Sequence, residues 1–229
     1  MAEQGTRTKL AAAALQLFDS DGFNETTVDD IAARAGLSKT TFFRHFRSKE
    51  EAIFPDHDAT IREITTMFEL ADSADRLNTV TLGAKHVLSR YVEEGELARS
   101  RFRLTSSVPA LRDRELASVQ RYQRLFQRYL LEGVGDDWQE RLSAEIQASA
   151  VVTGNNFVIR RWLRGDTEDP LTEFDAVRMR LIAADWSVFS REEPTAAAAR
   201  VRPGSSIVVI DTGEDAQSVL AKLNGLFGT

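Results

Sequence analysis

The sequence predicts an all-α protein with two helical domains and a C-terminal extension. Apolar residues recur at helical spacing through most of the chain, and no alternating pattern of the kind that marks a strand occurs before residue 200. Glycine and proline divide these periodic segments into lengths typical of single helices. We therefore expect a three-helix domain with a helix-turn-helix over residues 1–48, a larger helical domain over residues 49–190, and an extension over residues 191–229.

The first predicted helix runs from about Thr6 to Ser20. Its apolar positions follow the i, i+4, i+7, i+8 spacing of one stripe, which consists of Leu10, Ala14, Leu17 and Phe18. A single stripe lets a helix pack on one side against a small core. Asp21 and Gly22 end the helix.

Two short helices follow, joined by a tight turn. Thr27 begins the first of them and forms an acidic variant of the capping box with Asp30. Gly36 ends this helix after about two turns. Ser38 caps the next helix, which runs over about residues 39–46. Two short helices around a glycine-containing turn are typical of a helix-turn-helix.

The rest of the chain is predicted to be helical up to its last forty or so residues. A helical run starts near Ser48, and Pro55 kinks or splits it. Further helices are expected over about residues 75–94, 96–107, 109–131, 136–163 and 170–189. In the extension, the β-branched run 207–210 predicts a strand and residues 214–226 predict a short amphipathic helix.

Composition excludes several classes of protein. The chain has no cysteine, so it has no disulfide and no thiolate metal site. No apolar run approaches the roughly 20 residues of a membrane-spanning helix, and the N-terminus lacks the apolar core of a signal peptide. We expect a cytoplasmic protein with no membrane partner. The formal net charge of -6 argues against binding nucleic acid by bulk charge, so such binding would need a local basic surface.

Residues 34–49 provide that local surface. They contain no acid and five basic residues, namely Arg34, Lys39, Arg44, Arg47 and Lys49. Phe42 and Phe46 are four residues apart and should face the core. The outward face then carries Lys39, Thr40, Phe43 and Arg44. Such a face can enter the major groove, where Lys or Arg donates to guanine and Thr meets a thymine methyl. The positions placed for phosphates are Ser38, Thr41, His45 and Lys49.

These residues also carry a family resemblance. Over residues 27–50 the chain has, in order, Thr, Ile-Ala, Ala-Gly, Ser, aromatic-x-His-Phe and Ser-Lys-Glu, and over about residues 7–54 it resembles the TetR family of regulators. The resemblance implies an all-α homodimer, a palindromic double-stranded DNA operator, and repression relieved by a small-molecule effector. It also adds Thr27 to the DNA-contacting residues. Where the family usually has Tyr this chain has Phe43, which can pack on a sugar or a thymine methyl but cannot donate to a phosphate.

The body behind the helix-turn-helix is expected to dimerise through the helices over residues 136–163 and 170–189, whose apolar faces call for a second copy. No ligand-binding residue can be assigned from the sequence. Polar and aromatic residues that could line a cavity are Phe68, His86, Arg90, Tyr91, Phe102, Tyr122, Phe126, Asn155, Asn156 and Arg160.

Two functions stay open at this point. The first is a repressor that a small-molecule ligand releases from its operator. The second is a DNA-binding regulator without such an effector, either constitutive or controlled by a protein partner. An internal cavity favours the first and a solid core the second.

We expect neither an enzyme nor a cofactor. Residues 209–213 resemble an aspartic protease signature, but that chemistry needs two such aspartates in a β-rich dimer. No residue is assigned a catalytic role. The histidines lack metal-ligand spacing, so no metal is expected either.

Overall fold

The computed structural model describes residues 2–189, and all regular structure within that range is helical. The N-terminal group comprises α1 (Ala2–Ser20), α2 (Val28–Arg34), α3 (Lys39–His45) and the 3-10 turn η1 (Glu51–Ile53). The all-α prediction is confirmed for these residues. The strand and helix predicted within residues 207–226 lie outside the described residues.

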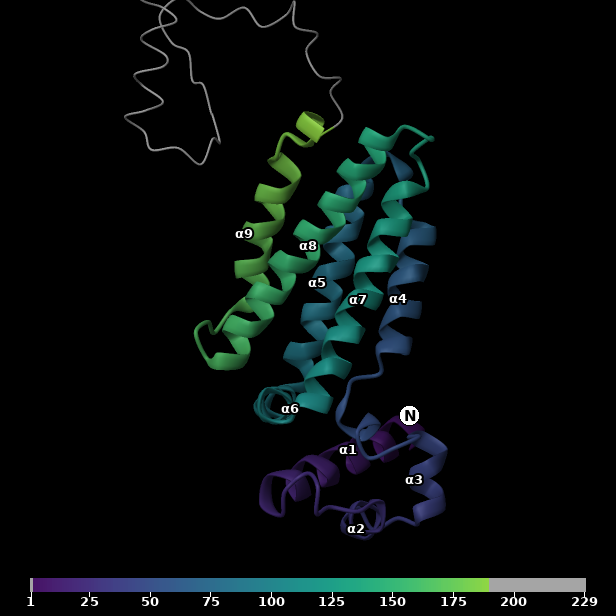
Figure 1. The fold of residues 1–229 in the computed structure, drawn as a ribbon, viewed down its shortest axis with the longest axis vertical. Helices are drawn as coiled ribbons and strands as arrows, with labels where there is room; N and C mark the ends of the chain where they lie inside the picture. Colours follow the sequence, from purple (N-terminus) through teal and green to yellow (C-terminus); the bar gives the residue numbers. More distant parts are fainter. Residues whose placement is uncertain (1, 190–229) are drawn as a thin grey trace, which may run out of the picture. The chain divides into compact units, whose positions relative to one another are not determined.

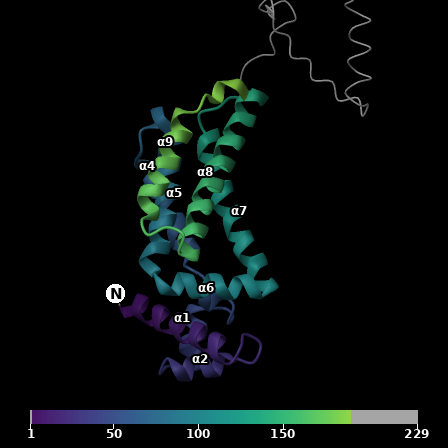
Figure 2. The same ribbon diagram turned by 90° about the vertical axis from the view of Figure 1, so that its left-hand side faces the viewer.

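The body is a bundle of long helices closed at one end by a crossing helix. The long helices are α4 (His57–Leu70), α5 (Arg76–Glu94), α7 (Pro109–Leu131), α8 (Trp138–Arg164) and α9 (Pro170–Ala183). The crossing helix α6 (Glu96–Ser107) runs over the lower end of the bundle and packs on α1 (Figures 1 and 2). Two 3-10 turns complete the body, η2 (Ser73–Asp75) and η3 (Trp186–Phe189). Helix α6 is therefore the part of the body that meets the N-terminal group.

The helix predicted to start near Ser48 is largely absent. Only the single turn η1 forms there, and α4 begins at His57, where the side chain of Asp56 accepts a hydrogen bond from the Ala59 amide at 2.9 Å. Pro55 explains the break, because a proline disfavours helical backbone in the residue before it, and Phe54 is extended with ψ 149°. The last predicted helix is also shorter than expected and ends at Ala183.

The N-terminal core is apolar and extends past the boundary predicted at residue 48. The stripe predicted on α1 is buried, as are Ala52, Ile53 and Phe54 after α3. Two side chains of the body, Leu104 of α6 and Leu111 of α7, belong to the same buried cluster. The core of the N-terminal group is thus shared with α6 and α7, while the helices of the body pack around a second core of their own.

Helices α8 and α9 pack closely against each other and leave apolar side chains uncovered. A Cβ atom added at Gly154 of α8 would lie 2.9 Å from Cγ1 of Val177 of α9, so glycine permits the close approach. Phe157 is 53% exposed and Met179 is 57% exposed on these two helices. An uncovered aromatic and an uncovered thioether side chain are suited to a protein partner.

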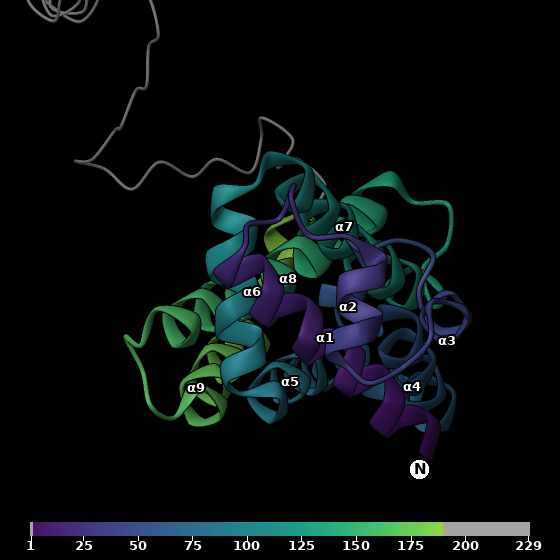
Figure 3. The same ribbon diagram turned by 90° about the horizontal axis from the view of Figure 1, so that it is seen from below.

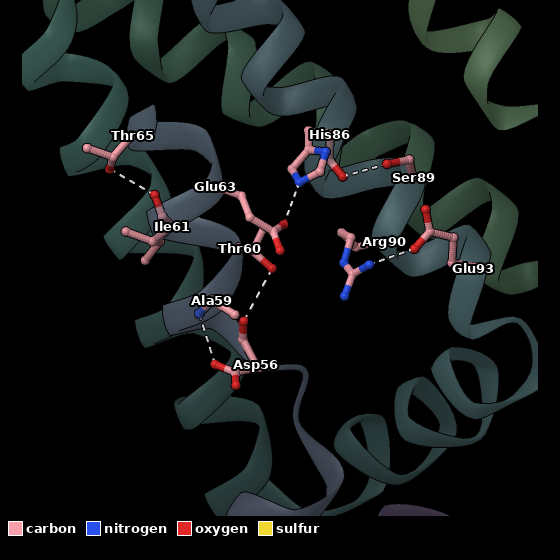
Figure 4. A network of polar contacts seen from close by, with 10 residues as sticks. All are labelled: Asp56, Ala59, Thr60, Ile61, Glu63, Thr65, His86, Ser89, Arg90 and Glu93. Carbon is pink, nitrogen blue, oxygen red and sulfur yellow. Dashed lines mark hydrogen bonds and ion pairs between the residues drawn. The ribbon is translucent and has the colours of Figure 1, made fainter. Parts of the chain in front are cut away.

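Polar side chains fasten α4 to its neighbours. The ring of His57, in the first turn of α4, lies 2.9 Å from the Tyr122 hydroxyl of α7, and burial lowers the pKa of His57 to about 4. Farther along, Nε2 of His86 on α5 lies 2.7 Å from Oε2 of Glu63 on α4 (Figure 4). Both contacts hold α4 against the bundle.

Candidate nucleic-acid interface and ligand cavity

The start of α2 is fixed by the predicted capping box. The Thr27 hydroxyl accepts from the Asp30 amide at 3.2 Å, and Oδ2 of Asp30 accepts from the Thr27 amide at 2.9 Å. The hydrogen bonds from the side chain and backbone of Thr27 hold the pKa of Asp30 below its usual value. Gly36, with φ 68°, then turns the chain toward α3.

Ser38 caps α3 as predicted. Its Oγ accepts from the Thr41 amide at 3.1 Å and lies 2.9 Å from the Thr41 hydroxyl. Phe42 and Phe46 are 0% and 2% exposed, which confirms that this side of α3 faces the core. The opposite side is exposed and carries Lys39, Thr40, Phe43 and Arg44.

This exposed face is the best candidate for contact with DNA bases. Figure 3 looks onto the end of the chain that holds α2 and α3. Phe43 is 50% exposed and meets Phe42 edge-on, with ring centroids 5.5 Å apart. Within residues 2–189 no acidic side chain pairs with Arg44. A free guanidinium beside a hydroxyl and an aromatic ring can bind guanine, phosphate or a thymine methyl.

The fold brings one acid to this face that the basic stretch itself does not contain. Oδ2 of Asp29, on α2, lies 2.8 Å from the ammonium of Lys39. Both side chains are more than half exposed, at 63% and 56%. Water screens such a pair, so a DNA phosphate can replace Asp29 as the partner of Lys39.

Lys49 is placed differently from the expectation that it contacts a phosphate. Its ammonium donates to three backbone carbonyls of the loop before α2, those of Phe23 at 2.7 Å, Asn24 at 3.2 Å and Thr26 at 3.0 Å. An ammonium has three N–H donors, and these bonds use all of them. The ammonium also lies 4.6 Å from the centre of the Phe23 ring. Lys49 therefore holds the loop before α2 in place, and we do not propose it as a contact to DNA.

Arg7 is a second positioning residue, and the sequence analysis missed it. Its Nη1 donates to the His45 carbonyl at 3.0 Å, and its guanidinium lies 4.4 Å from the centre of the Phe46 ring. These contacts tie α1 to the end of α3. Helical spacing could have indicated this role, because Arg7 lies three residues before Leu10 and therefore on the buried side of α1. His45 itself is half-buried, and its Nε2 is enclosed without a hydrogen-bond partner, so this nitrogen does not face a phosphate.

A second candidate site is a cavity in the body of about 230 Å³. Side chains of α5, α6, α7 and α8 line it. The apolar part of the wall is Ala98, Phe102, Leu116, Val119, Ile159 and Leu163. The polar part is Tyr91, Arg101, Thr105, Ser106, Arg112, Glu115, Asn156 and Arg160.

The cavity contains only some of the residues that the sequence offered for it. Those in the wall are Tyr91, Phe102, Asn156 and Arg160. A smaller adjoining cavity is lined in part by Tyr122, Phe126 and Asn155. Phe68 packs in the body core. His86 of α5 instead pairs with Glu63 of α4, and Arg90 pairs with Glu93 within α5 (Figure 4).

The wall of the cavity includes a buried cation that reaches the N-terminal group. Arg101 of α6 is 4% exposed. Its Nη1 donates to the Ile53 carbonyl of η1 at 3.2 Å, and its Nη2 donates to Oε2 of Glu94 at 2.5 Å. Its guanidinium also lies 5.3 Å from the centre of the Tyr91 ring. One side chain thus contacts the cavity, the end of α5 and the turn after the helix-turn-helix.

The described residues form neither a metal-binding cluster nor a membrane-spanning helix. Within residues 2–189 no three acidic or histidine side chains are grouped to hold a metal ion. In the same part of the chain no helix has the length and apolar character to span a membrane.

Comparisons with known proteins agree on one family and one fold. The family model of bacterial regulatory proteins of the tetR family matches residues 10–53. The HTH-type transcriptional regulator TcmR of Streptomyces glaucescens is 27% identical over 195 residues, which cover 79% of this chain and 86% of that protein. The matched segment of the family model contains α2, α3 and the whole basic stretch 34–49.

Two solved structures share the fold at low sequence identity. The fatty acid degradation regulator FadR of Bacillus halodurans aligns with a TM-score of 0.55 and 18% identity, over 78% of this chain and 95% of its own. The transcriptional regulator FadR of Bacillus subtilis, solved in complex with stearoyl-CoA, aligns with a TM-score of 0.53 and 16% identity, over 77% and 97%. The arrangement of a small N-terminal helical group on a larger helical body is therefore shared with these regulators.

Proposed function

The chain belongs to the TetR family of bacterial transcriptional regulators, and from this premise we propose that it is a homodimeric repressor that a small molecule releases from a palindromic operator. The exposed face of α3 carries the proposal for DNA. Lys39, Thr40 and Arg44 are exposed there together, on a helix whose other side is anchored in the core. Such a regulator acts on chromosomal DNA in the cytoplasm.

The proposed contacts divide into two classes. Base contacts come from Lys39, Thr40, Phe43 and Arg44. Phosphate contacts come from the starts of α2 and α3, through Thr27, Ser38 and Thr41, together with the amides of those helix starts. His45 would join them only after its ring rotates outward.

Dimerisation is proposed through α8 and α9. These helices leave Phe157 and Met179 uncovered, and a second copy would bury both. A symmetric dimer also suits DNA, since two recognition helices must lie about 34–36 Å apart to read successive major grooves.

Of the two alternatives, control by a small molecule and control by a protein partner alone, the cavity favours the first. Its volume of about 230 Å³ is below the roughly 300–1,000 Å³ typical of pockets for drug-sized ligands, which favours a compact effector. Release requires that the effector bind the DNA-free arrangement more tightly than the DNA-bound one. Because Arg101 joins the cavity wall to η1, a shift of the wall can move the N-terminal group and change the spacing of the two α3 helices.

The test is binding to the DNA upstream of the protein's own gene, measured by fluorescence anisotropy at several salt concentrations. The variant Lys39→Ala/Arg44→Ala should abolish binding that survives competitor DNA, because it removes both cations of the reading face. The matched control is Arg124→Ala/Arg128→Ala, which removes the same charge from exposed positions on α7 and should leave affinity nearly unchanged. If fragments selected from the whole genome also show no preferred sequence, the proposal is abandoned.

A further inference from the structure

The cavity wall holds a carboxylate oxygen that lacks a donor. Oε1 of Glu115 accepts from the Tyr91 hydroxyl at 2.8 Å, whereas Oε2 of the same group is buried and has no partner among the described residues. Burial, followed by the negative charge of Glu115, raises the pKa of Tyr91 well above its usual value, so the phenol stays protonated and donates. Buried oxygens are nearly always hydrogen-bonded in native proteins, which makes Oε2 an open acceptor that needs a donor.

A second acceptor nearby is open in the same way. Asn155 is 5% exposed, and its Oδ1 is buried without a partner. It lines the smaller cavity, which shares Val119 and Asn156 with the main one. Both unsatisfied atoms at this place are acceptors. A ligand group that pairs with either oxygen must therefore be a hydrogen-bond donor.

The remaining wall decides what kind of molecule could supply the donor. Phe102, Leu116, Val119 and Ile159 give most of the cavity an apolar lining. The buried cation Arg101 is already paired with Glu94, and the other two arginines of the wall, Arg112 and Arg160, are exposed to solvent. A ligand carboxylate placed at the Glu115 oxygen would meet a group of like charge.

We propose that the cavity recognises a compact apolar molecule bearing a hydroxyl group, such as a phenol, whose O–H donates to Oε2 of Glu115. This inference rests on the proposed function only in naming that molecule as the effector. The binding itself requires no DNA. A site built to accept one hydroxyl rejects the analogue that lacks it, because the buried oxygen is then left unpaired.

The test uses two probes that differ in a single donor, 1-naphthol and 1-methoxynaphthalene, titrated into the full-length protein by calorimetry. The wild type should bind 1-naphthol at least about tenfold more tightly. Equal affinities would overturn the proposal, and so would the absence of binding by both probes. Neither result would change the conclusion on operator binding, which is measured separately. Failure of the hydroxyl proposal is therefore distinguishable from failure of the proposed function.

Variants assign the preference to Glu115. Glu115→Met keeps the length of the side chain without an acceptor, so it should weaken 1-naphthol about tenfold and leave 1-methoxynaphthalene nearly unchanged. Glu115→Gln keeps a neutral acceptor and should reduce the preference only in part, which also covers the case in which the Met variant does not fold. The control Glu96→Met removes a carboxylate that is 71% exposed on α6 and pairs with Arg103. A full preference for 1-naphthol in both Glu115 variants would refute the assignment.

Discussion

The two candidate sites of this protein differ in how many of their polar groups are hydrogen-bonded within the chain. Around α2 and α3 the groups that fix the two helices are hydrogen-bonded within the chain, through the Thr27 capping box, the Ser38 cap and the three carbonyls on Lys49, although the enclosed Nε2 of His45 has no partner among the described residues. Around the body cavity, one oxygen of Glu115 and one of Asn155 have no donor among the described residues. A satisfied framework holds the reading helix in one position, while open acceptors leave binding energy for a ligand to supply.

The regions also differ in how they are connected to the rest of the molecule. The exposed face of α3 that we propose for base contacts is formed by four residues of one short helix, whereas the wall of the cavity is formed by four helices. Arg101 joins them, since it contacts the cavity and donates to the Ile53 carbonyl. Four substitutions, with their controls, test this difference between the two regions.

The largest effect is expected for Arg101→Met. It leaves the carboxylate of Glu94, which is 29% exposed, without its cation and the Ile53 carbonyl without its donor. Breaking a buried pair costs about 3 kcal/mol, so the free energy of unfolding in urea should fall by that amount, and operator affinity should fall about tenfold. The control Arg103→Met breaks an exposed pair with Glu96 and should cost less than about 1 kcal/mol. Equal losses in the two variants would deny Arg101 a connecting role.

An intermediate effect separates Lys49 from the exposed face of α3. Lys49→Met should lower the free energy of unfolding by about 2 kcal/mol, because three loop carbonyls lose a charged donor, yet the salt dependence of DNA binding should not change. Arg44→Ala should change the free energy of unfolding by less than about 0.5 kcal/mol from that of the wild type. The slope of log affinity against log salt should fall by about 1 for each α3 helix. A lower slope in Lys49→Met would return Lys49 to the interface.

The smallest effect is expected for Asp29→Asn. The exposed pair between Asp29 and Lys39 is worth about 0.2–1 kcal/mol, and DNA binding must give it up. Removing the acid should therefore raise operator affinity about two- to fivefold in the anisotropy assay. Asp113→Asn, on the exposed side of α7, makes the same change of charge away from α3 and serves as the control. Equal gains in the two variants would mean that net charge alone is responsible.

Local signals in the sequence predicted most of the helices. Glycine and proline act on the backbone next to them, so the bounds of α6, which follows Gly95, and of α7, which begins at Pro109, match the predicted 96–107 and 109–131. The capping box of α2 is confirmed as well. The predicted split of the helical run at Pro55 is confirmed, because Phe54 before it is extended. The part of the run before Pro55 was predicted too long, since only the single turn η1 forms there.

Side chains that reach distant parts of the chain were beyond prediction. The exposure of Lys39, Thr40 and Arg44 follows from helical periodicity, and the structure agrees with it. Lys49, in contrast, turns inward to carbonyls 23–26 residues earlier in the sequence, and no local pattern encodes such a contact. The cavity was unpredictable for the same reason, because its wall exists only once four helices have packed.

The shared core limits how freely this protein can be recombined with others. Leu104 and Leu111 of the body are buried among residues of the N-terminal group. A hybrid sensor that joins residues 1–54 to an unrelated effector domain would replace these two leucines by whatever side chains the new domain presents. The unit to transplant therefore includes α6 and the first turn of α7, and hybrids joined after residue 54 should require repacking around these two positions before they respond to a new compound.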